Sequence, residues 1–510
     1  MELLTPAQMQ EIDKRAIKEY LIPSMLLMEH AAYQIFSYIK DEYDGNKVII
    51  VCGPGNNGGD GLALARQLVI WTRCKVKVIM TGVSDSLTQD GQVYYIVCQN
   101  MGIDIIQMVE DNKEEVLRQI HDADVIVDAL FGTGLTRPIK GVYKEIIEWI
   151  NESPGKVISI DIPSGIDGLT GQIQGVCVQA NVTITFVRPK LGLYLYPAIL
   201  YTGEVRVEKI GIPEKLIEST EVNFFSIEKE EMRKLLPLRP IRSNKGSFGK
   251  VLTIGGSLGM AGAITLTSMA AYKVGCGTVT TVVPRCIIEI MQQKLTEAMA
   301  IGLEDNNGYF SKNAAKQLKT ILSNYHIVTI GPGIGRNKEI LSLLIEVIES
   351  DKPCIIDADA LYYLSEVLEL LKVRKAPTII TPHPGEMARL VGVNIEDILK
   401  DPLKYAVDFA KKFNTITVLK LEKTVIADTT GVIYINRYGN SGLAKGGSGD
   451  TLTGIITGLL AQRMSAIDAA KLGVYLQTRA ADLARDSMSE YSFLASDVIH
   501  FLSNTFLELT

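Results

Sequence analysis

The sequence predicts an α/β protein built from two domains, and three observations support this fold class. The chain has 510 residues, which is too long for a single hydrophobic core. Short runs rich in Val and Ile, of the length of buried strands, alternate with segments of helical character in both halves. Most of these runs end in glycine-rich or acidic loops, as in parallel sheets with helices on both faces.

The first domain is expected to begin with two helices and a strand. Thr5 is placed to cap a helix that starts at Pro6, since proline at that position lacks only an N–H that the helix does not use. A second helix is expected over Ser24–Ile39. Lys47–Cys52 is a short, mostly apolar run and predicts a buried parallel strand.

A glycine-rich loop, Gly53–Gly61, follows that strand and is expected to lead into a helix over Leu62–Ile70. Strand, glycine loop and helix is the order of dinucleotide-binding units. However, the second strand, Cys74–Met80, ends at Thr81 without an acid to hold a ribose. The two asparagines and the aspartate of the loop suit a polar ligand or a hard monovalent cation instead.

Two further strands end in polar loops. Asp124–Asp128 leads to Gly132–Pro138, and Lys156–Ile160 leads to Asp161. Ligands of open α/β sheets bind at the carboxyl ends of the strands, so one pocket is expected to gather these loops. The residues expected there are Asn56, Asn57, Asp60, Asp128, Gly132 to Pro138, Asp161 and Ser164. The alternative is that they are separate turn and capping residues.

These loops resemble the epimerase domain of the NAD(P)H-hydrate repair enzymes. The matching segments are Gly53–Gly61, Asp128–Gly134 and Asp161–Gly165, and the resemblance extends over roughly residues 1 to 215. It implies a Rossmann-like three-layer α/β domain that interconverts the R and S epimers of NAD(P)HX. The potassium ligands that it implies are Asn57, Asp128 and Ser164. The substrate-binding residues that it implies are Asn56, Asn57, Gly58, Gly59, Asp60, Gly132, Thr133, Gly134, Leu135, Thr136, Arg137, Pro138, Tyr143 and Asp161.

Epimerisation inverts C6 of the hydrated ring, which carries a hydroxyl beside the ring nitrogen. The nitrogen lone pair can expel the hydroxyl group and leave an iminium ion that takes up water on either face. Asp161 is the candidate catalytic acid/base, because a carboxylate can protonate the leaving oxygen and stabilise the cation. The alternative is that Asp161 only binds the ribose or the nicotinamide.

The alternation of strands and loops lapses between Gly211 and about Asn244. Charges gather in this segment, and Pro237 and Pro240 follow them, which indicates a domain boundary. The boundary is placed near Glu221, so that residues 1–220 form the first domain and residues 221–510 the second.

The second half repeats the α/β pattern. Val251–Ile254 and Thr278–Val283 are expected strands on either side of a helix over Ile264–Val274. A further strand leads into Gly331–Gly335, which alone is a weak indication of a binding loop and is equally explained as a turn. Another leads into Asp357 and Asp359, which either place magnesium or simply end a strand. A mainly parallel sheet with helices on both faces is expected.

The stretch Ala444–Thr451 precedes an apolar helix and carries Gly446, Gly447, Gly449 and Asp450. Glycines at a helix start let backbone N–H groups converge on an anion, towards which the positive end of the helix dipole points. Asp450 is placed to take a proton from a hydroxyl near a phosphate. The alternative is a glycine-rich helix start with a capping aspartate.

Together these segments resemble the ribokinase-like fold and, more narrowly, the nucleotide-dependent NAD(P)H-hydrate dehydratases. The matching segments are Gly255–Ser257, Gly262–Ala263, Gly331–Gly333, Thr381–Glu386 and Ala444–Thr451. The resemblance implies that Ala263, Gly333, His383 and Asp450 contact the hydrate. It implies that Lys420, Leu421, Glu422, Lys423, Thr424, Gly447, Ser448 and Gly449 contact the adenine nucleotide.

The implied reaction phosphorylates the C6 oxygen of (6S)-NAD(P)HX and then expels phosphate, which restores NAD(P)H. Asp450 would remove the hydroxyl proton as the catalytic base, and magnesium would bridge the phosphates of ADP or ATP. The resemblance to two-domain chains favours ADP. One departure concerns Leu421, which stands where the family has glycine, because leucine lacks the conformational freedom of glycine at positive φ.

The composition limits the classes of partner that the protein is expected to bind. A net charge of −6 argues against a nucleic-acid partner, and the seven scattered cysteines argue for reduced thiols. No signal peptide and no apolar run of about 20 residues is visible, so a cytoplasmic protein without membrane contact is expected. Homo-oligomerisation is also expected.

A bifunctional repair enzyme, epimerase and then dehydratase, is therefore the leading interpretation. One rival is a ribokinase-type small-molecule kinase fused to a non-catalytic Rossmann-like domain. Another is that the first domain is a scaffold or an RNA-binding module, against which Asn57, Asp60, Asp128 and Asp161 speak together.

Overall fold

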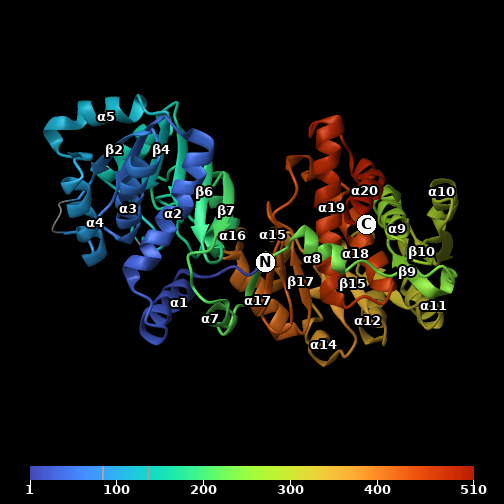
Figure 1. The fold of residues 1–510 in the computed structure, drawn as a ribbon. Coiled ribbons are helices and arrows are strands. Elements are labelled where there is room, and N and C mark those ends of the chain that lie inside the picture. Colours follow the sequence, from blue (N-terminus) through green and yellow to red (C-terminus); the bar gives the residue numbers. More distant parts are fainter. Residues whose placement is uncertain (83–85, 136) are drawn as a thin grey trace. The chain divides into compact units, whose positions relative to one another are not determined.

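The computed structural model describes residues 1–82, 86–135 and 137–510, which fold into two compact units (Figure 1). The first unit comprises Glu2–Phe224, and the second comprises Phe225–Thr510 together with Met1. The change from one unit to the other falls within a short strand, β8 (Phe224–Ser226).

The first unit alternates strands and helices in chain order. Its helices are α1 (Pro6–Glu19), α2 (Ser24–Tyr43), α3 (Asn56–Trp71), α4 (Gln89–Asn100), α5 (Lys113–His121), α6 (Val142–Glu152) and α7 (Glu214–Glu218). Its strands are β1 (Lys47–Cys52), β2 (Lys75–Met80), β3 (Asp104–Gln107), β4 (Val125–Ala129), β5 (Lys156–Ile160), β6 (Val182–Phe186) and β7 (Glu204–Glu208).

Within the described ranges, these strands form one parallel sheet of order β3-β2-β1-β4-β5-β6-β7. Successive residues of β1 face opposite sides of the sheet. Val48 and Ile50 join an apolar core with α1 to α4, whereas Ile49 and Val51 join a second core with α5 and α6. Helices thus cover both faces, which confirms the three-layer prediction.

The strand order reverses direction between β1 and β4, and this is where open α/β sheets bind ligands. The loops that follow these two strands touch closely. A Cβ atom on Gly53 would lie 1.9 Å from the carbonyl oxygen of Leu130, so only glycine permits this approach. The glycine that opens the loop is therefore explained by packing between the two strand ends.

The predicted strands Lys47–Cys52 and Lys156–Ile160 have the bounds of β1 and β5, and Thr5 caps α1 as predicted. The predicted start of the next helix at Leu62 is wrong, because α3 begins at Asn56. The glycines of this segment suggested a loop, but Gly58 lies in the helix, where a Cβ atom would clash with the carbonyl oxygen of Gly53 at 1.9 Å. Close packing outweighs the poor helix propensity of glycine here.

The second unit has a larger sheet. Its helices are α8 (Lys229–Lys234), α9 (Ala261–Lys273), α10 (Ile288–Lys294), α11 (Lys312–Leu322), α12 (Ile340–Glu349), α13 (Asp359–Leu364), α14 (Leu368–Val373), α15 (Pro384–Val391), α16 (Ile395–Lys400), α17 (Pro402–Phe413), α18 (Ser448–Ala461), α19 (Ala466–Met488) and α20 (Ala495–Leu509). Its strands after β8 are β9 (Lys250–Ile254), β10 (Thr278–Pro284), β11 (Met299–Leu303), β12 (Asp305–Asn306), β13 (Tyr309–Phe310), β14 (Ile327–Ile330), β15 (Cys354–Ile356), β16 (Thr378–Ile380), β17 (Ile416–Leu419), β18 (Val425–Ala427) and β19 (Ile433–Ile435).

The main sheet of this unit has the order β11-β10-β9-β14-β15-β16-β17-β18-β19-β8. The pairs from β11 to β17 are parallel, as predicted, whereas β17, β18 and β19 pair antiparallel. Apolar residues of α9, α18, α19 and α20 pack on one face, and Figure 1 shows α11, α12 and α14 on the other side of the strands. The strand order again reverses at neighbouring strands, here β9 and β14, whose loops meet at Gly255 and Pro332.

Candidate active sites

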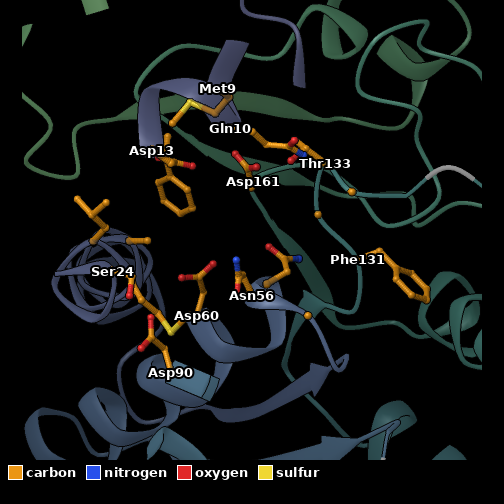
Figure 2. A pocket seen from close by; sticks show the side chains of 18 of the residues that line it. Met9, Gln10, Asp13, Ser24, Asn56, Asp60, Asp90, Phe131, Thr133 and Asp161 are labelled. Atoms are coloured by element: carbon orange, nitrogen blue, oxygen red, sulfur yellow. The ribbon is translucent and has the colours of Figure 1, made fainter. Parts of the chain in front are cut away.

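The first unit holds a cavity of about 550 Å³ at the carboxyl ends of β1, β4 and β5 (Figure 2). Loops and helix starts after these strands supply one side of its lining, and α1 and α2 supply another. The polar residues that line the cavity are Gln10, Asp13, Ser24, Asn56, Asn57, Asp60, Asp90, Thr133, Arg137, Asp161 and Lys190. A strand-end cavity with so many polar groups suits a polar small molecule.

Asp161 follows β5 and has a left-handed backbone conformation, with φ of 64°. For a residue other than glycine this conformation is uncommon and costs energy, so the surrounding structure must hold it. Its Oδ1 atom forms an ion pair with the ammonium of Lys190 and accepts a hydrogen bond from Thr185 Oγ1 at 3.0 Å. Both contacts use Oδ1, which leaves Oδ2 available to a ligand.

Lys190 is almost fully buried, with 1% of its surface exposed. Besides Asp161, its ammonium donates hydrogen bonds to Thr185 Oγ1 at 3.1 Å and to the carbonyl oxygen of Phe186 at 3.2 Å. All of its donors are therefore directed at fixed acceptors, and the side chain has no freedom to leave Asp161. This arrangement fixes the carboxylate in the cavity.

Two other carboxyl groups face the same cavity without such a cation. Burial raises the pKa of Asp13 to about 6, and the proximity of Lys190 offsets part of this effect. Burial also raises the pKa of Asp60 well above its usual range, and the neighbouring carboxylates of Asp161 and Asp13 add to the effect. Desolvation favours the neutral form of a carboxyl group, so Asp13 and Asp60 keep their protons to a higher pH than an exposed aspartate does.

A second set of oxygen atoms lies behind the cavity, around the fully buried Asp128 at the end of β4. Its Oδ2 accepts hydrogen bonds from Ser159 Oγ and from the backbone N–H of Ser164, each at 2.8 Å. Its Oδ1 accepts one from Ser164 Oγ at 2.5 Å. Burial raises the pKa of Asp128, and these hydrogen bonds lower it in part.

Asn57 in α3 is buried, and its Nδ2 atom has no hydrogen-bond partner among the described residues. An amide without a hydrogen-bond partner can be turned by 180°, which puts its oxygen where the nitrogen was. In that orientation the Asn57 oxygen can bind a cation. One carboxylate, one amide and one hydroxyl make a hard, oxygen-rich donor set of low charge. Such a set fits a monovalent cation.

The structure brings most of the substrate-binding residues expected in the first unit to the cavity. The expected residues in its lining are Asn56, Asn57, Asp60, Gly132, Thr133, Gly134, Leu135, Arg137 and Asp161. Gly58, Gly59, Pro138 and Tyr143 are not in the lining, and the Tyr143 ring packs against Phe131 with centroids 5.0 Å apart. Thr136 lies outside the described residues.

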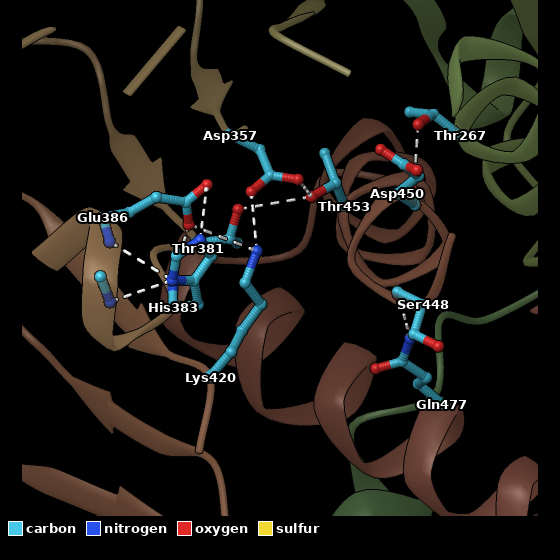
Figure 3. A network of polar contacts seen from close by, with 11 residues as sticks. Thr267, Asp357, Thr381, His383, Glu386, Lys420, Ser448, Asp450, Thr453 and Gln477 are labelled. Atoms are coloured by element: carbon cyan, nitrogen blue, oxygen red, sulfur yellow. Dashed lines mark hydrogen bonds and ion pairs between the residues drawn. The ribbon is translucent and has the colours of Figure 1, made fainter. Parts of the chain in front are cut away.

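The second unit assembles its polar residues at the carboxyl ends of β14 to β17 and at the start of α18 (Figure 3). Gly447 precedes α18 with φ of 96°, and a Cβ atom there would lie 2.7 Å from Leu266 Cδ1. The backbone N–H groups of Gly447, Gly449 and Asp450 donate no hydrogen bond to any described residue. They are therefore free to bind an anion, as predicted for a helix start of this kind.

Asp450 lies in the first turn of α18, and Thr267 Oγ1 donates a hydrogen bond to its backbone oxygen at 3.1 Å. Burial and, to a lesser extent, the nearby Asp357 raise the pKa of its carboxyl group to about 6, although Lys420 acts against them. The carboxylate is thus a stronger base than an exposed aspartate while still ionised at neutral pH.

Lys420 joins the strand ends electrostatically. Its ammonium lies 2.9 Å from Oδ1 of the buried Asp357 and 3.9 Å from Oε2 of Glu386. The other oxygen of Asp357 accepts a hydrogen bond from Thr453 Oγ1 in α18 at 2.7 Å. A Cβ atom on Gly449 would lie 3.3 Å from the Lys420 ammonium, so this cation is beside the free N–H groups.

His383 caps α15, since its Nδ1 accepts hydrogen bonds from the backbone N–H groups of Gly385 at 3.0 Å and Glu386 at 3.3 Å. Burial and the nearby Lys420 lower the pKa of His383. The ring is therefore neutral at pH 7 with its proton on Nε2, which is available as a donor. Burial raises the pKa of Glu386 to about 7, although Lys420 lowers it.

Ala263 lies close to Asp450, because Thr267 Oγ1 donates a hydrogen bond to the backbone oxygen of each at 3.1 Å. Gly333 follows β14 with φ of 63°, and a Cβ atom there would lie 3.0 Å from that of Ala263. Ser257 Oγ donates a hydrogen bond to the Gly333 oxygen at 2.9 Å.

Leu421 has no positive φ, so the leucine is accommodated without the strain that its replacement of glycine suggested. Asp357 and Asp359 are each paired with a cation, Lys420 and Arg336.

Sequence reasoning missed Asp13 and Lys190. Asp13 belongs to an amphipathic helix, where an acid usually faces solvent, and Lys190 follows β6 in a segment without a glycine signature. Only the end of β6 gave a signal, because it is another strand end at the same edge of the sheet. In the second unit, the hydrogen bond from Thr453 to Asp357 was also not predicted.

Comparison with known families matches residues 24–192 to "YjeF-related protein N-terminus" and residues 251–504 to "NAD(P)H-hydrate dehydratase". A bifunctional NAD(P)H-hydrate repair enzyme of Moorella thermoacetica is 38% identical over 98% of this chain and 96% of its own. Its Escherichia coli counterpart is 33% identical over 93% of this chain and 88% of its own.

A solved structure of an ADP/ATP-dependent NAD(P)H-hydrate dehydratase from Bacillus subtilis, co-crystallised with ATP and Mg²⁺, is 32% identical to this chain. It covers 56% of this chain and 99% of its own, with a TM-score of 0.51. None of the described helices is long and apolar enough to cross a membrane. Two matched domains and full-length relatives show that the chain belongs to the bifunctional NAD(P)H-hydrate repair enzymes.

Proposed function

We propose that this chain restores hydrated nicotinamide cofactors in two steps, one in each unit. The first unit interconverts (6R)- and (6S)-NAD(P)HX, and the second dehydrates the S epimer to NAD(P)H with ADP or ATP as phosphoryl donor. Membership of the bifunctional family supports both activities. The observation that carries the proposal is the pair of strand-end sites, each with a partly buried carboxyl group that faces ligand-accessible groups.

In the first site, Asp161 is the proposed acid/base. Lys190 holds its Oδ1, so that Oδ2 can contact the hydroxyl on C6 of the ring. The carboxylate also stabilises the positive charge that develops on the ring as the hydroxyl leaves. The loops with Asn56 and Gly132–Leu135 supply polar contacts for the remainder of the dinucleotide.

The proposed potassium ligands are Asn57, Asp128 and Ser164. Asp128 is a buried carboxyl group whose partners are two hydroxyls and two backbone N–H groups, without a neighbouring cation among its hydrogen-bond and ion-pair contacts in the described chain. Together with the orphaned Asn57 amide, it fits a bound monovalent cation. When bound, such an ion supplies a fixed positive charge that orders the loops after β1 and β4.

In the second site, Asp450 is the proposed base that takes the proton of the C6 hydroxyl as the phosphoryl group is transferred. The free N–H groups of Gly447, Gly449 and Asp450 stabilise the charge of the phosphoryl oxygens, and the Lys420 ammonium adds a positive charge beside them. His383 Nε2 is a neutral donor for the substrate.

The proposed nucleotide contacts run from Lys420 to Thr424 and over Gly447–Gly449. Magnesium bound with the nucleotide would withdraw negative charge from the phosphates at this site. Across the described ranges no three His, Cys, Asp or Glu side chains come together as a metal site.

Incubation of purified NADHX epimers with the chain, Mg²⁺ and ADP tests the proposal. The expected result is recovery of absorbance at 340 nm with stoichiometric AMP and phosphate, from both epimers. ATP in place of ADP identifies the preferred donor. A kinase fused to a binding domain would instead accumulate a stable phosphorylated product, and no recovery of absorbance would contradict the proposal.

A further inference from the structure

Asp60 extends from the second turn of α3 into the first cavity, and it has no hydrogen bond or ion pair with any described residue. In Figure 2 its carboxyl group lies on the side of the cavity opposite Asp161, with open space between the two. An unpaired, largely desolvated carboxyl group costs stability, and folded proteins rarely keep one without a use. Substrate binding alone gives no reason for a group that favours a proton.

The charges around Asp60 come from several elements. Asp161 after β5, Asp13 on α1 and Lys190 after β6 act on it directly, and Asp90 on α4 lines the same cavity. The thiol of Cys52 lies beneath, and burial raises its pKa well above the usual range, so it stays neutral. The Lys190 ammonium is paired with Asp161. Burial raises the pKa of Asp60 although this ammonium is nearby.

Inversion at C6 sets a geometric requirement. The hydroxyl leaves from one face of the ring, and water adds to the other face. A single carboxyl group on one side of the cavity can serve only one of these events, so two groups on opposite sides are needed. Asp161 and Asp60 meet this requirement, one paired with an ammonium and the other unpaired.

We propose that Asp60 is a second catalytic acid/base of the epimerase, acting on the face of the ring opposite Asp161. The inference rests on the epimerase activity proposed above and deepens it. It also assigns Asp60 a chemical role in addition to the binding contact expected from the glycine-rich loop.

The C6–O bond breaks as the ring nitrogen lone pair forms a C6=N bond, and the Asp60 proton goes to the leaving oxygen, which departs as water. A second water adds to C6 from the other face, the C6=N electrons return to nitrogen, and the proton of that water goes to Asp161 Oδ2. The pair carries one proton before and after the inversion and none while the iminium ion exists. The reverse reaction starts from the other form, and exchange with solvent resets the pair.

Asp60→Asn in the full chain is the test, with (6R)-NADHX as substrate and chromatographic separation of the epimers in the absence of nucleotide. Asparagine keeps the shape and the neutrality of a protonated aspartate but donates no acidic proton. We expect kcat for epimerisation to fall at least about 100-fold, with KM within about threefold of the wild type. Asp41→Asn, which removes an exposed carboxyl group of the same unit, is the matched control and keeps the wild-type rate.

The pH profile provides an independent readout. A pair that needs one proton gives a bell-shaped profile in the wild type, and Asp60→Asn removes one limb. If the Asn variant loses the thermal transition of its domain, Asp60→Glu decides, because the retained carboxyl group should restore at least a tenth of the rate while Asp60→Gln does not.

An Asn variant with wild-type kcat, or one in which only KM rises, overturns the assignment and leaves Asp60 as a binding residue. A wild-type chain that does not interconvert the epimers refutes instead the proposed epimerase activity, so the two failures are distinguishable.

Discussion

The ammonium of Lys420 lies 2.9 Å from the buried carboxylate of Asp357, and this ion pair joins two strand ends of the second unit beside the start of α18. Burial disfavours the charge on Lys420, but Asp357 and Glu386 more than compensate, so that its pKa is raised. The cation therefore stays charged in a place where a phosphoryl group is expected to arrive.

Lys420→Met removes this charge and leaves the Asp357 carboxylate buried without its partner. We expect the free energy of unfolding to fall by about 3 kcal/mol and dehydration of (6S)-NADHX to slow by more than tenfold. Adding Asp357→Asn should restore stability but not activity. Chemical denaturation and initial rates measure the two effects. Lys372→Met, which breaks an exposed ion pair with Glu369, is the control and should change stability by less than about 1 kcal/mol.

The rate of dehydration should depend on pH through Asp450. A base must be ionised to accept a proton, and burial raises the pKa of Asp450 to about 6. The rate should therefore rise as pH increases through 6, with about a tenfold deficit at pH 5 relative to pH 8. Stopped assays over this range, with the S epimer and saturating nucleotide, measure it. A flat profile between pH 5 and 7 would show that Asp450 is not the base.

Potassium should stabilise the first unit. A cation bound at Asp128 offsets the cost of a buried carboxylate, so the thermal midpoint of this unit should rise in potassium chloride relative to choline chloride at equal ionic strength. Differential scanning calorimetry of the full chain records the transition. Asp128→Asn should abolish the potassium dependence, and Asp122→Asn, an exposed neighbour in sequence, should retain it. Equal midpoints of the wild type in both salts would refute the assigned site.

Arg374 should be a stability determinant of the second unit. The buried guanidinium donates to the carbonyl oxygens of Val347 at 3.2 Å and Ser350 at 2.7 Å, and its Nε donates to Thr378 Oγ1 at 2.9 Å. Arg374→Met removes these hydrogen bonds and takes the donor from the Ser350 oxygen, whereas the Val347 oxygen keeps the bond from Ser350 Oγ at 2.7 Å. The loss should cost at least about 3 kcal/mol. Lys375→Met, next in the chain and exposed, should cost less than about 0.5 kcal/mol. Denaturant unfolding distinguishes the two, and equal stabilities would contradict the capping role.

Much of this fold could be predicted from the sequence because its strands are continuous apolar runs. The runs at Lys47 and Lys156 keep their predicted bounds, since parallel strands buried on both faces leave little ambiguity of period. The start of α3 could not be predicted, because the glycines there suggest a loop. The helical position of Gly58 depends on its close contact with Gly53. That contact depends on tertiary packing.

The candidate sites were predictable to the extent that their residues follow strands. Asp161 directly follows β5, and Asp450 lies in the first turn of α18, at the helix start that the glycines indicated. Lys190 and Asp13 reach the first cavity from elements that local sequence does not place beside it. The raised pKa values of Asp60 and Asp13 could not be predicted from the sequence either, because they depend on burial and on charged residues that are distant in the chain.

The most direct test of the two-site account compares Asp161→Ala and Asp450→Ala on each purified epimer, with ADP and Mg²⁺ and absorbance at 340 nm. Asp161→Ala should repair the S epimer at the wild-type rate and leave the R epimer unrepaired. Asp450→Ala should recover no absorbance from either epimer but still interconvert them. Repair of the R epimer by Asp161→Ala at the wild-type rate, or loss of interconversion in Asp450→Ala, would contradict the account.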